Sequence, residues 1–425
     1  MEKQNPLEWS KNLTMYEVNL RQYSEKGDFK SFEDDLPRLK KLGVGIIWFM
    51  PIFPVGKKNR KGKLGSQYSV RNYHKIYSGY GTLAAFKRLV KKIHKEGMYV
   101  LMDWVANHTA WDHHWTKEKP EFYVKDEDGN IVSPNQDWTD VAKLDFENRD
   151  LWEAMADEML YWIKNTGIDG FRCDMAHLVP TEFWNFIREK LDEEKKVLML
   201  AESENRDLLE KAFDMEYNWN LHHLFNAIAK NEKCVWDIDH ALQNEIYDFP
   251  TEKSQLLFTS NHDENSWQGA AVQRLGLGLE PLNVLAFTMD GMPLIYNGQE
   301  AGLYKKLSFF EKDPIPWQED KMFAFYQKLI QLRKKNPALW SGVYGGKLQR
   351  VYTEVGHAIF AFVRKKEGEK VVVITNLSHD YHEFTLQGDA YNGIFTDVFA
   401  ETEIALHENF RMGLQPWEYK VYSTK

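Results

Sequence analysis

The sequence predicts an α/β protein, a (β/α)8 TIM barrel with a short insertion after its third strand and a C-terminal antiparallel β-domain. Eight short apolar runs alternate with longer segments of helical periodicity. Polar and charged residues are concentrated where several of those runs end. From about residue 343 the pattern changes to alternating, strand-like segments.

The eight candidate strands are apolar over most of their length, as parallel strands covered by helices should be. They are expected at residues 14–19, 44–50, 99–105, 168–174, 197–202, 213–217, 256–260 and 293–297.

Segments with helical periodicity lie between these strands, and the helix of the third strand comes only after the insertion. The helices are expected at residues 32–43, 83–97, 148–167, 181–194, 224–231 together with 236–249, 281–291 and 323–336. Gly43, Gly97 and Gly167 follow three of these segments, as helix C-terminal caps prefer.

Two segments depart from the alternation of strand and helix. Residues 109–144 form no barrel helix, and "FYVKDEDGNIVS" within them predicts a small hairpin because Asp-Gly favours a tight turn. The same "DEDGN" has only part of a calcium loop and lacks the closing Glu. We therefore expect a barrel over 1–108 and 145–342, an insertion over 109–144 and a C-terminal β-sandwich over 343–425.

Composition excludes several classes of protein. The 425 residues carry a net charge of −9 with no basic face, so a nucleic-acid partner is not expected. No apolar run reaches the roughly 18 residues of a membrane span. Cys173 and Cys234 form no CxxC pair, so neither a metal knuckle nor a disulfide framework is predicted. The 15 Trp residues either fill the core or line a cleft for ring-shaped ligands.

The N-terminus, "MEKQNPLEWS", lacks the apolar region of a signal peptide. Two interpretations stay open: the protein stays in the cytoplasm, or the sequence begins after a removed export signal. Nothing in the sequence predicts an oligomeric state.

The run "GFRCDMAH" places Arg172 and Asp174 two positions apart on a strand. Side chains at i and i+2 share a face, so both charges point the same way and Cys173 points to the other side. This pair is either an internal ion pair or part of a reacting site.

Other strand ends also carry polar residues, and barrel active sites lie at the C-terminal ends of strands. The polar residues at or just after strand ends are Asp103, Arg172, Asp174, Glu202, Asp214, Asn261, His262 and Asp263. Retaining cleavage of a glycosidic bond needs two carboxyl groups about 5–5.5 Å apart. Arg172 would favour the ionised form of Asp174 as a nucleophile. The general acid, which must be protonated, would be Glu202 or Glu204; the two lie two positions apart and would share a strand face.

Several separated motifs resemble those of the α-amylase family, glycoside hydrolase family 13, over nearly the whole chain. They are "GIIWFMPIF" (45–53), "DWVANH" (103–108), "GFRCDMAH" (170–177), "AE" (201–202), "FTSNHDEN" (258–265) and "GMPLIYNGQE" (291–300). The resemblance implies that Asp174 is the nucleophile, Glu202 the general acid/base and Asp263 the transition-state stabiliser. It also implies sugar contacts from Arg172, His108, His262 and Tyr68, the last by stacking. The insertion then corresponds to the family's domain B and the C-terminal β-domain to its domain C.

Two departures from the family pattern bear on cofactor and specificity. Many members hold a structural calcium through an Asp of a motif resembling "LPDLN", and here Lys143 stands at that place in "VAKLDFEN". Although Asn107 survives, we expect no calcium and no other cofactor, as in the neopullulanase and cyclomaltodextrinase branch that the Lys resembles. His177 and Leu178 replace the Lys-His of typical endo-acting amylases, so binding on the leaving-group side should differ.

The sequence therefore predicts a retaining hydrolase of α-1,4 bonds in starch-like glucans or maltooligosaccharides. An α-glucosidase or a glucanotransferase on the same framework is the first alternative, because transfer and hydrolysis differ only in the attacking group. The alternative of another class is a non-catalytic sugar-binding protein. Endo or exo action and α-1,4 or α-1,6 preference stay open.

Overall fold

A computed structural model of the chain describes residues 5–424, apart from the side chains of residues 244–248. Its central strands are β1 (Met15–Val18), β2 (Ile46–Phe49), β3 (Tyr99–Val105), β6 (Gly170–Asp174), β7 (Leu198–Ala201), β8 (Met215–Tyr217), β9 (Ser254–Leu257) and β10 (Met292–Tyr296). All are parallel and close in the order β1-β10-β9-β8-β7-β6-β3-β2. The predicted barrel is confirmed, and each strand overlaps one predicted run.

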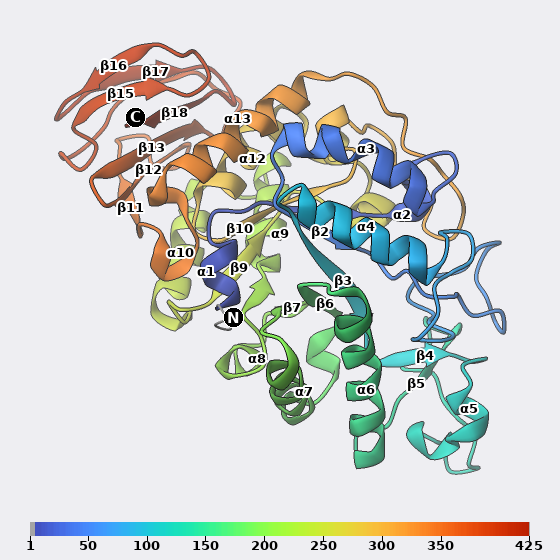
Figure 1. Cartoon of the computed structure of the whole chain (residues 1–425). Helices are drawn as coiled ribbons and strands as arrows, with labels where there is room; N and C mark the ends of the chain where they lie inside the picture. The colour runs from blue at the N-terminus through green and yellow to red at the C-terminus, as the bar shows by residue number, and fades with distance from the viewer. Residues whose placement is uncertain (1–4, 425) are drawn as a thin grey trace.

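Helices surround this barrel (Figure 1). The longer ones are α3 (Phe29–Leu42), α4 (Leu83–Lys95), α6 (Arg149–Thr166), α7 (Thr181–Glu194), α9 (Trp219–Ala229), α10 (Val235–Asp248), α12 (Leu279–Thr288) and α13 (Lys321–Lys335). Short helices are α1 (Pro6–Ser10), α2 (Leu20–Tyr23), α5 (Trp115–Glu118), α8 (Asp207–Glu210) and α11 (Ala271–Leu275). Among the described residues, no helix combines the length and apolar character that crossing a membrane requires.

Helix limits follow local chemistry. Asp28 caps α3 by accepting a hydrogen bond from the Ser31 N–H, and Gly43 ends it in the left-handed conformation with φ 99°. Gly167 ends α6 in the same way with φ 77°. These are two of the glycines that the sequence marks as C-terminal caps.

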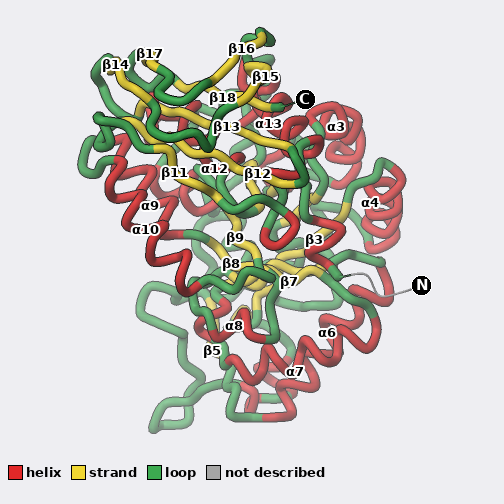
Figure 2. The backbone as a smooth tube through the Cα atoms, turned by 90° about the vertical axis from the view of Figure 1, so that its left-hand side faces the viewer, coloured by secondary structure: helices red, strands yellow, loops and turns green. Residues whose placement is uncertain are grey.

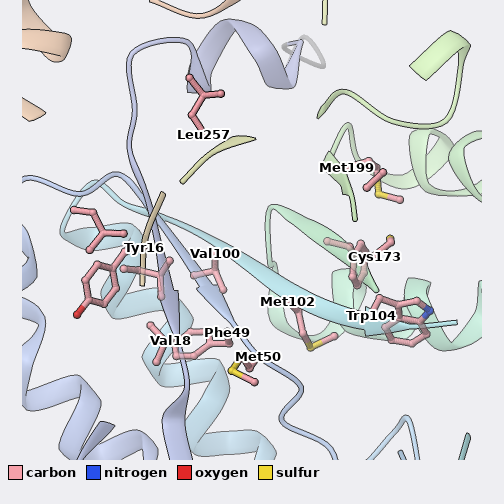
Figure 3. Close-up of a cluster of buried hydrophobic side chains, with 14 of the residues drawn as sticks. Tyr16, Val18, Phe49, Met50, Val100, Met102, Trp104, Cys173, Met199 and Leu257 are labelled. Atoms are coloured by element: carbon pink, nitrogen blue, oxygen red, sulfur yellow. The ribbon is translucent and has the colours of Figure 1, made fainter. Parts of the chain in front are cut away.

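The two faces of the barrel strands serve different cores. One set of strand side chains packs outward against the helices, and Figure 3 shows part of it, including Phe49, Met102, Trp104 and Cys173. The alternate residues fill the barrel interior; they include Trp48, Leu101, Leu200 and Tyr217. Because side chains alternate along a strand, Asp103, Arg172 and Asp174 belong to the interior set.

The insertion after β3 contains β4 (His108–Ala110), β5 (Val141–Lys143) and α5. β4 and β5 pair antiparallel, with His108 opposite Lys143. An isolated antiparallel bridge joins Lys125 to Ile131, where the sequence predicts a hairpin. Figure 1 shows these elements on the side of the barrel away from the C-terminal sheets.

Two antiparallel sheets follow the barrel (Figure 2). Their strands are β11 (Leu348–Val351), β12 (Ile359–Lys366), β13 (Glu369–Asn376), β14 (His382–Thr385), β15 (Gly393–Asp397), β16 (Glu403–Leu406), β17 (Arg411–Leu414) and β18 (Tyr419–Ser423). Six form one sheet and β14 pairs with β17. The buried Arg364 of β12 donates hydrogen bonds to the carbonyls of Met289 and Trp340, which ties this part to the barrel. The predicted C-terminal β-domain is confirmed, while its boundary at 343 stays a prediction.

One strand-end residue lies at the wrong end of its strand. The sequence suggests that Asp214 faces the site, but it immediately precedes β8. Its carboxylate accepts from the Met199 N–H at 2.9 Å and pairs with Arg188 of α7 at 2.8 Å. Asp214 therefore joins the starts of two strands to a helix; it is the second residue of the predicted run 213–217, so grouping it with the strand ends was wrong.

Candidate active site

Arg172 lies at the centre of a buried cluster of carboxylates at the C-terminal ends of β3, β6 and β7. Its Nη1 lies 3.0 Å from Asp103 Oδ1 and 3.0 Å from Asp174 Oδ1. Its Nη2 lies 2.8 Å from Glu202 Oε2, just after β7. The strand register aligns Asp103 with Arg172, so barrel closure brings these groups together. Arg172 is thus not paired with Asp174 alone but is shared by three carboxylates.

Glu202 has a second fixed contact. The N–H of Met175 donates to Glu202 Oε2 at 2.8 Å, and Met175 holds an unusual left-handed backbone with φ 44°. Strained backbone of this kind is found preferentially at functional sites. Glu204, the other candidate from "ESE", is exposed and accepts from the Asn220 N–H instead. Only Glu202 therefore joins the Arg172 cluster.

The ionisation of Asp174 differs from the expectation based on Arg172 alone. Burial and the neighbouring Glu202 carboxylate raise the pKa of Asp174 well above its usual value, and the Arg172 guanidinium only partly opposes them. Burial likewise raises the pKa of Asp103, against the opposing effect of Arg172. One cation shared among several desolvated carboxylates cannot lower the pKa of all of them. The prediction that Arg172 favours the charged form is right in sign, but its effect is not the largest.

Tyr68 and His262 form the adjoining wall of the site. The Tyr68 hydroxyl donates to Asp103 Oδ2 at 2.9 Å and lies 2.8 Å from His262 Nε2. The two rings stack with centroids 5.3 Å apart. His262 Nε2 also lies 3.2 Å from Asp263 Oδ2, and the Asp263 side chain is 34% exposed. Burial raises the pKa of Asp263, while His262 lowers it.

A residue that the sequence analysis missed holds the far side of His262. Glu17, fully buried on β1, places Oε1 2.5 Å from His262 Nδ1. Burial alone would lower the pKa of His262, but the carboxylates of Asp263 and Glu17 raise it to about 9. His262 is therefore a cation near neutral pH. The available signal was a single carboxylate inside the apolar run "TMYEVN".

His108, at the start of β4, is neutral near pH 7, unlike His262. Burial lowers its pKa to about 4, although a hydrogen bond to the Tyr68 backbone raises it slightly. Its ring lies edge-on to Trp138 of the insertion, with centroids 5.6 Å apart. The structure thus joins Tyr68, Arg172, Asp174, Glu202, His262 and Asp263 through direct contacts and places His108 against Tyr68.

Comparison with known proteins identifies the family of this chain. The sequence family described as "Alpha amylase, catalytic domain" matches residues 11–140 and 134–314. The chain belongs to the alpha-amylase family. It is therefore a glycoside hydrolase that acts on α-glucans.

Similar proteins of the alpha-amylase family cover almost the whole chain. The crystal structure of a noncanonic maltogenic alpha-amylase from Thermotoga neapolitana is 30% identical, with a TM-score of 0.89 over 97% of this chain and 98% of that one. An alpha-amylase from Lactobacillus plantarum is 29% identical, with a TM-score of 0.88 over 98% and 100%. Alpha-amylase 3 of Dictyoglomus thermophilum is 24% identical over 90% of this chain and 88% of its own length.

A pocket of about 480 Å³ opens beside Glu202 in this family member. Its lining consists of Met175, His177, Glu202, Ser203, Glu204, Asn205 and Trp219. The pocket combines an indole with carboxylate, amide and imidazole groups, a mixture suited to a hydroxylated ring. Leu178, which the sequence marked beside His177, is 44% exposed.

Proposed function

We propose that this protein is a retaining hydrolase of α-1,4-glucosidic bonds in starch-like glucans or maltooligosaccharides. In this proposal Asp174 is the nucleophile, Glu202 the general acid/base and Asp263 the stabiliser of the transition state. The observation that carries it is that one guanidinium, Arg172, contacts both Asp174 and Glu202, at 3.0 and 2.8 Å. Two carboxylates on one guanidinium are close enough to flank a single glycosidic bond.

The proposed reaction has two balanced steps. An Asp174 oxygen attacks the anomeric carbon while Glu202 transfers its proton to the leaving oxygen, which gives a covalent glycosyl-enzyme and a shortened glucan. Glu202, now a carboxylate, then takes a proton from water, and the hydroxide oxygen displaces Asp174 from the same carbon. Two displacements restore the original anomeric configuration.

The sugar at the site would be held by Tyr68, His108, Arg172 and His262. Tyr68 offers an aromatic ring, and its raised pKa, caused by burial, keeps the hydroxyl protonated. A cationic His262 and a neutral His108 would present different hydrogen-bonding groups to the sugar hydroxyls. Relatives named cyclomaltodextrinase (Bacillus sp.) and maltogenic alpha-amylase (Bacillus acidopullulyticus), 26% and 25% identical, support maltooligosaccharides as the substrate class.

Glucan transfer is the second candidate function. The pocket beside Glu202 supports it, because an acceptor sugar could bind there. A sugar held there by Trp219 and Asn205 would lie next to the group that activates the attacking hydroxyl. Occupation of that pocket by an acceptor sugar instead of water would convert the second displacement into transfer.

We also propose that the protein holds no structural calcium between barrel and insertion. Lys143, on β5, projects from the same face of the β4–β5 pair as His108, and it brings a positive charge to the region. The nearby Asn107 side chain already contacts His108 Nδ1 at 3.2 Å. Calcium prefers six to eight oxygen ligands, so an ammonium group in their midst opposes its binding.

The test is a time course of products from maltose to maltoheptaose, with the anomeric form of the first product read by proton NMR. We expect α-anomers first, and total loss of turnover in D174N with an unchanged fold by circular dichroism. Glu210, exposed at the end of α8, provides the control E210Q, which should retain full activity. Inversion of configuration, or activity in D174N, would overturn the assignment.

A further inference from the structure

A row of aromatic rings leads from the candidate active site to the surface. His262 stacks on Tyr68, and Tyr68 lies 6.5 Å from Phe309 with an angle of 16° between the rings. Phe309 lies 5.1 Å from Trp267 at 33°. We call these four side chains the aromatic row. Its outer member, Trp267, is 50% exposed, whereas Tyr68 and His262 are buried.

Trp267 is placed by the segment that follows Asp263. Residues Glu264–Gln268 form a π-helical turn, a rare conformation that is found frequently at functional sites. The Trp267 side chain lies close enough to the Asp263 carboxylate to lower its pKa, against the larger, opposing effect of burial. The indole therefore lies beside the proposed stabiliser, although much of it faces solvent.

The rest of the row is fixed by the loop that follows β10. The buried Asn265 side chain accepts from the Leu307 N–H at 2.9 Å and donates to the Lys305 carbonyl at 3.2 Å. Lys306 Nζ donates to the Trp267 carbonyl at 2.9 Å. The π-helical turn and this loop are thus one unit, and the row is held ready before any ligand arrives.

A single exposed tryptophan is normal on a protein surface and needs no function. Trp236 of α10 is such a case: it is 63% exposed, and its ring lies next to that of His357, which is not part of the row. Trp267 differs because its ring contacts Phe309, which in turn lies next to Tyr68 at the site. The row shares no residue with the pocket beside Glu202, so it is a separate surface.

We propose that Trp267 and Phe309 bind a glucose unit of the α-glucan that lies towards the rim, beyond the two units that flank the reacting bond. This inference rests on the proposed function and names a further substrate-binding surface for it. The C–H face of a pyranose ring is apolar and packs on aromatic side chains, while its hydroxyls stay in water. The ligand is a neutral glucan chain long enough to reach from the site to the rim.

Chain length is the property that this surface controls. A disaccharide held at the reacting centre gains nothing from Trp267, whereas a longer chain gains a contact that comes with little ordering of the protein. Loss of one well-placed aromatic contact weakens binding by about tenfold. The effect should therefore rise with the number of glucose units.

The test measures binding of maltose and maltohexaose by calorimetry in the D174N background, where no product forms. We expect W267A to weaken maltohexaose binding about tenfold and maltose binding less than about twofold. W267F keeps a flat ring but removes the indole N–H near Asp263, and it should stay within about threefold of the parent. W236A is the matched control and should bind as the parent does.

Each other outcome contradicts the inference. Unchanged maltohexaose binding in W267A would show that the ring contacts no sugar. Equal losses for both ligands would show that Trp267 acts only through Asp263. If D174N itself binds neither sugar, the proposed function fails, and this surface fails with it. Unfolding curves of every variant separate these results from misfolding.

Discussion

Glu17 offers a direct test of the electrostatics of this site. The substitution E17Q keeps an oxygen that can accept from His262 Nδ1 but removes the negative charge 2.5 Å away. Other charged groups also act on His262: the carboxylates of Asp263 and Asp103 raise its pKa, and Arg172 lowers it. Because Gln has nearly the same shape, the packing inside β1 should be preserved.

The magnitude follows from the pKa of His262, about 9 in the folded protein. Against an unfolded value of about 6.5, this difference corresponds to about 3.4 kcal/mol of stability. The raised value means that this stability is fully present below about pH 6.5 and is lost as the pH rises towards 9. An opposite charge in contact shifts a pKa by about 1–3, so E17Q should lower the pKa of His262 by about 1–2.

The assay is the titration of the His262 ring by NMR with 13C-labelled histidine, assigned with H262Q. Urea unfolding between pH 6.5 and 9 gives a second reading: the fall in unfolding free energy should be smaller in E17Q than in the parent by about 1.4–2.7 kcal/mol. The absolute stability does not enter, because E17Q also removes a buried charge. An unchanged His262 pKa, or equal pH slopes for both proteins, would refute the reasoning.

Four further outcomes are expected. The acid limb of kcat/KM should lie above the usual Asp pKa, because burial and Glu202 raise that of Asp174, and a limb below pH 4 would contradict this. Excess EDTA should leave Tm unchanged if Lys143 takes the place of calcium. A clear fall in Tm would show that the protein does hold a structural metal ion. R172M should cost about 3–5 kcal/mol in urea unfolding at pH 7 and less at low pH, where carboxylates are protonated. A Cβ at Gly170 would lie 2.0 Å from the Leu198 carbonyl oxygen. G170A should therefore cost about 1–3 kcal/mol or more by urea unfolding, unlike the control G356A.

The barrel could be predicted because its signals are local. Alternation along "GFRCD" assigns Cys173 to the outer layer and Arg172 to the interior from period two alone, and the structure has both where predicted. Gly43 and Gly167 mark helix ends because the left-handed conformation suits glycine. The family motifs are also contiguous stretches.

Other features depend on contacts between distant parts of the chain. Glu17 and His262 are 245 residues apart and meet only because β1 closes the barrel. Trp267 and Phe309 come from two different loops that Asn265 joins. Asp214 binds the backbone of Met199 and the side chain of Arg188, two contacts that no local pattern around "FDMEY" could reveal.

Patterns along the chain were enough to predict the barrel, the order of its strands and, through the family motifs, the choice of Glu202 over Glu204. The folded chain was needed to show that Glu202 shares Arg172 with Asp103 and Asp174, and that burial outweighs Arg172 in the ionisation of Asp174. Periodicity is a property of neighbours along the chain, whereas a pKa sums the desolvation and charges of all neighbours in space. Those neighbours exist only after the barrel has closed.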